Sequence, residues 1–240
     1  MSAATSTLGP SAYWYLTRST GAVAMVLLTA TVALGVVDVR RWTSERWPRF
    51  VIDGLHRNIA LLTLVFLLVH ILTSVLDSFA PIGLLDAVVP FAGSYRPFWL
   101  GLGAVSFDLL LAVTITSLLR RRVGHRGWRA VHWLSYASWP VALLHGFGTG
   151  SDVKDTWLLL LSLACLAVVA ISVLVRVAAG WPQALRLRGA ALAATVAFAL
   201  FLVVWLPSGP LGSGWAKRAG TPTSLLHAST AKKAHRSSTR

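Results

Sequence analysis

The stretch HRNIALLTLVFLLVH, residues 56–70, decides how this chain folds. Ten of the thirteen residues between the two terminal histidines are apolar, which is typical of a helix surrounded by lipid. A histidine is energetically expensive in hydrocarbon, so its presence there indicates a functional role. The 14-residue interval corresponds to about 20 Å along a helix and leaves both histidines on one side of it.

A second stretch, HWLSYASWPVALLH, residues 132–145, has the same layout with a 13-residue interval. On a regular helix this interval leaves about 140° between the two histidines. Pro140 lies between them and can kink or locally rewind a membrane helix, which would bring both rings inward. Two such helices side by side would place one histidine pair near each membrane face.

The composition of the whole chain agrees with a membrane protein. It has 240 residues, of which 55% are hydrophobic and 12% charged, whereas a soluble domain has about 25% charged residues. We expect an all-α, polytopic helical bundle of about six transmembrane helices, the last short enough to be re-entrant. The predicted spans are 19–38, 57–77, 99–119, 130–147, 156–175 and 190–206.

Loop charge predicts the orientation of these spans. Three alternate loops, 39–57, 120–129 and 176–189, carry thirteen arginines, whereas Arg18, Arg96 and Lys154 are the only basic residues counted on the other side. Because basic loops stay in the cytoplasm, we expect the Arg-rich loops there and both termini outside. The net charge of +14 then reflects loop and tail residues and predicts no nucleic-acid partner.

Three regions follow from this pattern. Residues 1–18 are expected to form a short extracytoplasmic N-terminus, and residues 19–206 the membrane domain. Residues 207–240 are rich in Ser, Thr, Ala and Lys, which predicts a basic disordered tail attracted to anionic lipid.

The four histidines His56, His70, His132 and His145 are candidate metal ligands. Two axial imidazoles give a low-spin, coordinatively filled haem that is suited to electron transfer. The sequence therefore predicts two bis-histidine b-type haems, and no catalytic residue is assigned. Arginine suits haem propionates, and the candidates are Arg57 and Arg129 on the inner side, with Arg18 and Arg96 on the outer side. For Arg57 and Arg129, simple topology signalling is an equally good interpretation.

No motif for a nucleotide or a flavin is present in the sequence. We therefore expect one partner to supply the electrons, together with any flavin or quinone, and another partner to accept them. The expected donor is a cytoplasmic flavoprotein or a quinol, and the expected partner on the other side is an extracytoplasmic electron acceptor or flavin-binding protein.

Two segments give the chain a family resemblance. The run from Arg126 to Gly146, with His132 and His145, and the run WYLTRSTG at residues 14–21 resemble the ferric reductase-like transmembrane domain family. This family is related to the membrane domains of NADPH oxidases and ferric-chelate reductases and to the haem-binding subunit of the methionine sulfoxide reductase system. The resemblance covers roughly residues 12–175.

The resemblance implies that His56 and His132 hold the cytoplasmic-side haem, and His70 and His145 the outer one. It also implies a role for Arg18 near the outer haem. The carboxy-terminal FAD/NADPH domain of the oxidases is missing from this sequence, so we expect the electron-transfer component of an oxidoreductase. The resemblance to bacterial members implies a multi-pass protein of the bacterial plasma membrane.

Two alternatives remain open at this point. A transition-metal transporter would use the histidines to bind ions, and it predicts that they converge on one midplane site. A non-catalytic subunit would bind haem only for stability or sensing, and reduction by a physiological donor would distinguish it from an electron carrier.

Overall fold

A computed structural model describes residues 11–38, 49–150, 152–178 and 185–226. Within these ranges the chain forms nine helices and no strand. Their bounds are α1 Ala12–Asp38, α2 Arg49–Leu76, α3 Leu84–Val88, α4 Pro97–Leu118, α5 Arg120–His132, α6 Ser135–Thr149, α7 Thr156–Ala178, α8 Leu185–Ser208 and α9 Trp215–Arg218.

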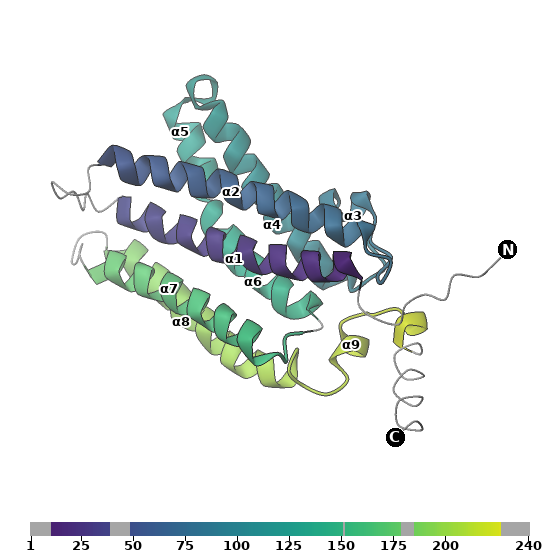
Figure 1. Ribbon diagram of the computed structural model, residues 1–240. Coiled ribbons are helices and arrows are strands. Elements are labelled where there is room, and N and C mark those ends of the chain that lie inside the picture. Colours follow the sequence, from purple (N-terminus) through teal and green to yellow (C-terminus); the bar gives the residue numbers. More distant parts are fainter. Residues whose placement is uncertain (1–10, 39–48, 151, 179–184, 227–240) are drawn as a thin grey trace.

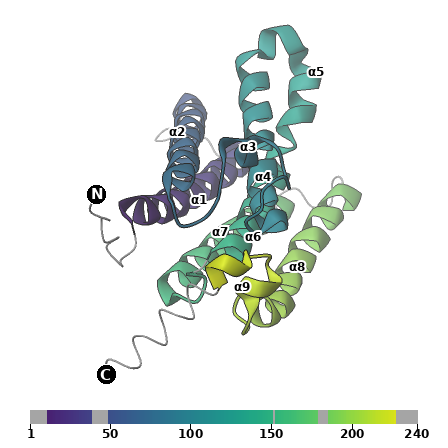
Figure 2. The same cartoon turned by 90° about the vertical axis from the view of Figure 1, so that its right-hand side faces the viewer.

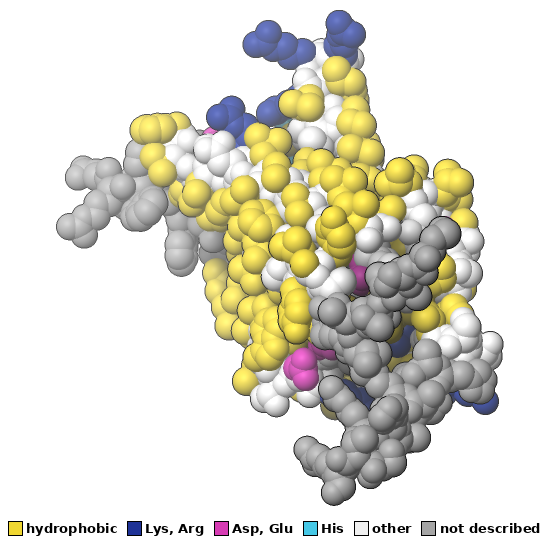
Figure 3. Space-filling view, turned by 45° about the vertical axis from the view of Figure 1, so that its right-hand side comes forward, with side chains coloured by type: hydrophobic (Ala, Val, Ile, Leu, Met, Phe, Trp, Pro, Cys, Tyr) yellow, Lys and Arg dark blue, Asp and Glu magenta, His cyan; other side chains and the backbone are white. Residues whose placement is uncertain are grey.

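Five of these helices, α1, α2, α4, α7 and α8, are long and apolar enough to cross a membrane. Their apolar side chains cover much of the outer surface of the molecule (Figure 3). In water such a surface would be unfavourable, but in a bilayer these side chains contact lipid while each helix satisfies its own backbone groups. The expected all-α polytopic membrane bundle is confirmed.

The helices pack as two layers (Figure 1). Helices α1 and α2 lie side by side, and α1 also contacts α6 and α7, while α4 packs against α6 and α7 against α8. Helix α5 and the end of α4 project beyond the bundle as a hairpin (Figure 2). Gly124, with φ of 77°, makes the turn of this hairpin because glycine adopts positive φ without a steric penalty.

Hydrogen bonds between helices fix the centre of the bundle. Trp139 Nε1 on α6 donates to Thr29 Oγ1 on α1 at 2.8 Å, and Ser106 Oγ on α4 donates to the carbonyl of Ser138 on α6 at 3.0 Å. Around them the buried apolar side chains of α1, α6, α7 and α8 form one core. Polar contacts of this kind, together with close packing, hold membrane helices together.

The predicted span 130–147 is divided between two helices. Helix α5 ends at His132, α6 begins at Ser135 and has 15 residues, and Pro140 lies inside α6. Around the break, Leu134, Tyr136 and Ala137 donate to carbonyls three residues earlier. Bonds of this type wind the chain at about 120° per residue instead of about 100°. The overwound turn lies between His132 and Pro140, and it reduces the angular mismatch between the two histidines.

The chain after residue 207 differs from the disordered tail that we expected. Pro207 and Ser208 belong to α8, and the following residues return to the bundle, where Trp215 Nε1 donates to the carbonyl of Gly148 at 3.2 Å. The Trp215 ring lies 5.3 Å from the ring of Trp99. Aromatic burial therefore orders this segment despite its polar composition. Residues 227–240 lie outside the described part of the chain, as do residues 1–10.

Candidate functional site

The four histidines form two pairs. The rings of His70 on α2 and His145 on α6 have centroids 6.4 Å apart, and so do the rings of His56 on α2 and His132 on α5. Because His56 and His70 are 14 residues apart on one helix, the two pairs lie about 20 Å apart along the bundle. The pairing expected from the resemblance is the pairing that the structure shows.

The spacing within each pair suits one metal atom between two imidazoles. A metal–imidazole bond is about 2.0–2.1 Å long, so two such bonds, with the distance from each nitrogen to its ring centre, give a centroid separation of about 6 Å. Two protein ligands do not complete the coordination of a transition metal, and a porphyrin supplies four further nitrogens. Each pair therefore fits a haem held by two axial histidines.

A site made by protein ligands alone does not fit. Within the part of the chain that the structure describes, no group of three or more His, Cys, Asp or Glu side chains is placed to hold a metal ion. The histidines also do not converge on one midplane site, which the transporter hypothesis requires.

Each pair faces its own cavity. His70 and His145 line a cavity of about 300 Å³ together with Arg18, and its walls are mostly apolar. His56 and His132 line a second cavity of about 1190 Å³. Both volumes are in or near the range of small-molecule and cofactor sites.

Three of the histidines are held by the backbone of a neighbouring helix. The Nδ1 atoms of His56, His70 and His145 lie 3.1, 2.7 and 2.9 Å from the carbonyl oxygens of Thr31, Thr17 and Trp99, respectively. With Nδ1–H donating to these carbonyls, Nε2 is left as the free metal ligand, and the bond fixes the tautomer and the ring orientation.

A glycine follows each of these carbonyls by four residues and makes room for the ring. A Cβ at Gly21 would lie 2.9 Å from His70 Nδ1, and one at Gly103 only 2.5 Å from His145 Nδ1. At Gly35 the nearest atom would be His56 Cε1, at 3.4 Å. We call each combination of a carbonyl and the glycine four residues later a backbone socket; the three sockets are Thr17/Gly21, Thr31/Gly35 and Trp99/Gly103.

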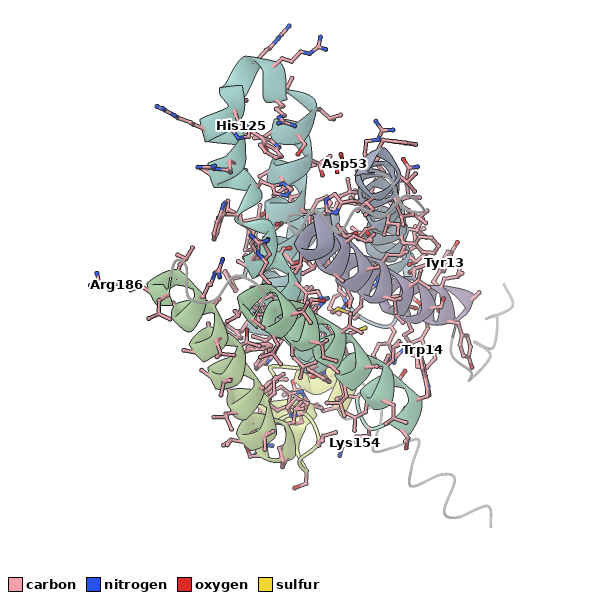
Figure 4. The ribbon with its side chains drawn as sticks, turned by 90° about the vertical axis from the view of Figure 1, so that its left-hand side faces the viewer. Tyr13, Trp14, Asp53, His125, Lys154 and Arg186 are labelled. Atoms are coloured by element: carbon pink, nitrogen blue, oxygen red, sulfur yellow. The ribbon has the colours of Figure 1, made fainter. Side chains whose placement is uncertain are left out.

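His132 has no such socket. Its Nδ1 atom is buried and has no hydrogen-bond partner within the described residues. Instead, the ring stacks on Trp128, one turn earlier on α5, with centroids 5.0 Å apart and planes inclined by 29°. The hairpin that carries Trp128 and His125 lies at one end of the molecule, away from Trp14 and Lys154 (Figure 4).

Arginines surround the cavity of His56 and His132. Arg57 and Arg129, both candidates from the sequence, line it, and the sequence analysis missed two further arginines there, Arg120 and Arg176. These side chains come from all three Arg-rich segments, so these segments lie at the same end of the bundle. Residues 39–48 of the first segment and 179–184 of the third lie outside the described residues.

Arg18 and Arg96, the two arginines expected beside the outer haem, lie in different surroundings. Arg18 lines the cavity of His70 and His145, where it forms an ion pair with Asp152 and lies 3.8 Å from the centre of the Trp14 ring. The Asp152 partner was missed because it lies 134 residues after Arg18 in the sequence, and only the fold brings the two side chains together.

Arg96 is instead a structural residue. Its side chain is 4% exposed and lies outside the residues lining either cavity. Its Nη1 donates to the carbonyls of Gly148 and Thr149, at 3.0 Å each, and its Nε to Thr221 Oγ1 at 2.9 Å. Burial lowers the pKa of this guanidinium, and the neighbouring Tyr95 opposes that shift. Arg96 thus joins α4, α6 and the returning C-terminal segment.

Comparison with known proteins agrees with this arrangement. The family model described as "Ferric reductase like transmembrane component" matches residues 20–143. The chain is also 33% identical over 144 residues to the protein-methionine-sulfoxide reductase heme-binding subunit MsrQ of Ralstonia nicotianae (strain ATCC BAA-1114 / GMI1000). The match covers 59% of this chain and 62% of that relative, less than two thirds of its length. No solved structure matches. The chain therefore belongs to the family of ferric reductase-like transmembrane components.

Proposed function

We propose that this protein is a dihaem b-type membrane cytochrome that carries electrons across the bacterial plasma membrane. The observation that carries the proposal is the presence of two imidazole pairs with the same 6.4 Å separation, near opposite ends of one membrane-spanning helix. His56 and His132 hold the inner haem, and His70 and His145 the outer one. The name of the Ralstonia relative, a heme-binding subunit, supports haem as the cofactor.

When bound, the haems supply reversible one-electron chemistry. The chain supplies the axial imidazoles and keeps them in place. The backbone sockets leave Nε2 of three histidines free to bind a metal, and a haem held by two histidines would have no open position for oxygen unless a histidine left.

Arginines at both ends suit the haem propionates. Arg57 and Arg129 line the inner cavity and Arg18 the outer one, where a guanidinium can pair with a carboxylate in a bidentate manner. Arg18 already pairs with Asp152, so at the outer site it would hold a propionate and this carboxylate in one cluster.

The Arg-rich end of the bundle faces the cytoplasm in this proposal, as the positive-inside rule requires. A cytoplasmic flavoprotein or a quinol would donate electrons at the His56/His132 pair, and an extracytoplasmic acceptor would receive them at the His70/His145 pair. The name of the Ralstonia relative suggests a methionine sulfoxide reductase as this acceptor, with this chain as its electron-transfer subunit. The spacing of about 20 Å between the pairs is shortened by the width of each macrocycle, which makes the relay feasible.

The proposal is tested by reconstituting the holoprotein in vesicles with a reductant on one side and a membrane-impermeant acceptor on the other. We expect both haems to be reduced and the acceptor to be reduced across the membrane. A protein that binds haem but transfers no electrons to the far side would instead be a non-catalytic haem-binding subunit.

A further inference from the structure

The backbone sockets follow a regular spacing on the two helices that face the histidines. Gly21 and Gly35 are 14 residues apart on α1, the same interval that separates His56 and His70 on α2. On α4, Gly103 forms the socket of His145. The residue 14 positions further along α4, where a fourth glycine would be expected, is Ser117, and the carbonyl four residues before it is that of Val113.

At this fourth position the chain has a serine, Ser117, in place of a glycine. Its hydroxyl donates to the Val113 carbonyl at 2.7 Å and accepts a hydrogen bond from Trp128 Nε1 at 3.1 Å. Val113, Ser117 and His132 all line the same cavity. The serine hydroxyl therefore bonds to the carbonyl that corresponds to the acceptors of the other three histidines, and its Cβ stands where each of the other sockets has a glycine.

The consequence for His132 is visible in its surroundings. Its buried Nδ1 has no hydrogen-bond partner among the described residues, whereas the other three histidines each have a backbone carbonyl at 3.1 Å or less. Its ring stacks on Trp128, whose own indole nitrogen is bonded to Ser117. The three sockets orient their imidazoles and make them stronger donors to a metal; His132 has neither advantage.

We infer that Ser117 keeps His132 unanchored, so that His132 is the one exchangeable axial ligand and the inner site binds a small neutral iron ligand such as carbon monoxide in its place. In this exchange the bond between iron and His132 Nε2 breaks and the iron–carbon bond forms. No electron is transferred, and the released imidazole stays neutral. The inference rests on the proposed haem binding and adds a binding site and a positioning residue, Ser117, to it.

The test is a titration of the dithionite-reduced holoprotein with carbon monoxide, after haem has been quantified per chain. We expect one molecule of carbon monoxide for every two haems. No binding to a preparation that holds two haems, or binding to both haems, would overturn the inference while leaving the dihaem proposal intact. A preparation without haem would overturn the dihaem proposal itself, and this is seen before any carbon monoxide is added.

Ser117→Gly is the decisive variant, because it opens the fourth socket and frees the Val113 carbonyl for His132. Changes in such outer contacts alter metal affinity about 10–100-fold, so we expect the half-saturating carbon monoxide concentration to rise by about this factor. Ser117→Ala is the matched control, since it also removes the hydroxyl but keeps the Cβ that blocks the socket. Equal titration curves for the two variants would overturn the inference.

Two tryptophan variants identify the haem that reacts. Trp128→Leu removes the ring that stacks on His132. It should therefore lower the half-saturating carbon monoxide concentration several-fold, because His132 is then held less firmly. Trp157→Leu, which alters a residue lining the cavity of the other pair, should leave it unchanged. If Trp157→Leu alters the half-saturating concentration and Trp128→Leu does not, the exchangeable ligand lies at the outer haem and the assignment to His132 is overturned.

Discussion

Gly103 on α4 lies directly against the ring of His145 on α6: a Cβ at this position would be 2.5 Å from Nδ1, the atom that bonds to the carbonyl of Trp99. The absence of a side chain at Gly103 is thus a condition for the hydrogen bond that orients His145. The same relationship links Gly21 with His70, where a Cβ would be 2.9 Å from Nδ1, whereas a Cβ at Gly35 would meet the His56 ring at 3.4 Å, an ordinary van der Waals contact. Helices α1 and α4, which carry no histidine of the pairs, therefore help to orient three of the four rings.

Gly103→Ala should displace His145 and abolish the outer haem. Contacts of 2.5 Å are not tolerated, and the atom in contact belongs to the ring itself rather than to a flexible chain end. Haem per chain should fall from two to about one, as measured by the pyridine haemochrome assay. Gly189→Ala is the control, because nothing lies within 4 Å of a Cβ there. Two retained haems in Gly103→Ala would contradict the role of this socket.

The two glycines of α1 should give graded effects. A Cβ would be 2.9 Å from the His70 ring at Gly21 but 3.4 Å from the His56 ring at Gly35. Gly21→Ala should therefore lose the outer haem, whereas Gly35→Ala should keep both haems and change only the midpoint potential of the inner one. Redox titration of each variant, followed by absorbance, makes the comparison. Equal haem loss in both variants would show that packing of α1 on α2, and not ring clearance, is responsible.

His145→Ala should remove the outer haem and stop reduction of the outside acceptor, while the inner haem remains reducible. The reason is that the two pairs occupy separate cavities and share no ligand. Absorption spectra with and without dithionite report the haem that remains. Loss of both haems in this variant would mean that the two sites are structurally inseparable.

Arg18→Gln should lower the midpoint potential of the outer haem. A nearby positive charge stabilises the reduced form, which is more negative than the oxidised form by one charge, and the charge lies in a low-dielectric cavity. A shift of about 60 mV corresponds to a tenfold change in the equilibrium. Lys154→Gln is the control, since Lys154 is exposed and lies outside the residues lining that cavity. An unchanged potential in Arg18→Gln would exclude Arg18 from the outer haem site.

Arg96→Met should destabilise the fold without removing haem. The substitution leaves the carbonyls of Gly148 and Thr149 without their guanidinium donor, and an unsatisfied buried polar group costs about 1–3 kcal/mol. Thr221→Val removes only the bond to Nε and should lower the melting temperature less. Thermal unfolding in detergent measures both effects. Haem loss from a folded Arg96→Met protein would instead place Arg96 at the cofactor.

The sequence was sufficient for the membrane class and for the histidine pairs. The apolar run between His56 and His70 correctly predicted one helix that carries both residues, and this helix is α2. The pairing of these residues with His132 and His145, inferred from family resemblance, also agrees with the ring separations. These features depend on local hydropathy and helical periodicity, which act within one element.

The features that the sequence analysis missed depend on local backbone winding or on contacts between elements. The break after His132 arises from local overwinding that hydropathy does not encode. Arg96 was expected near a haem because of its place along the chain, but it bonds to two carbonyls of another segment and to Thr221. The sockets did leave a signal, because Gly21 and Gly35 repeat the histidine interval; its meaning becomes clear only when α1 is seen to lie beside α2 (Figure 1).

The most direct test of the account is the absorption spectrum of the detergent-purified protein, oxidised and then reduced with dithionite, with haem quantified per chain. We predict a low-spin b-type spectrum and about two haems per chain, since the 6.4 Å separation of each imidazole pair fits one haem. A protein produced with ample haem that contains none would contradict the account and would make the histidine pairs structural.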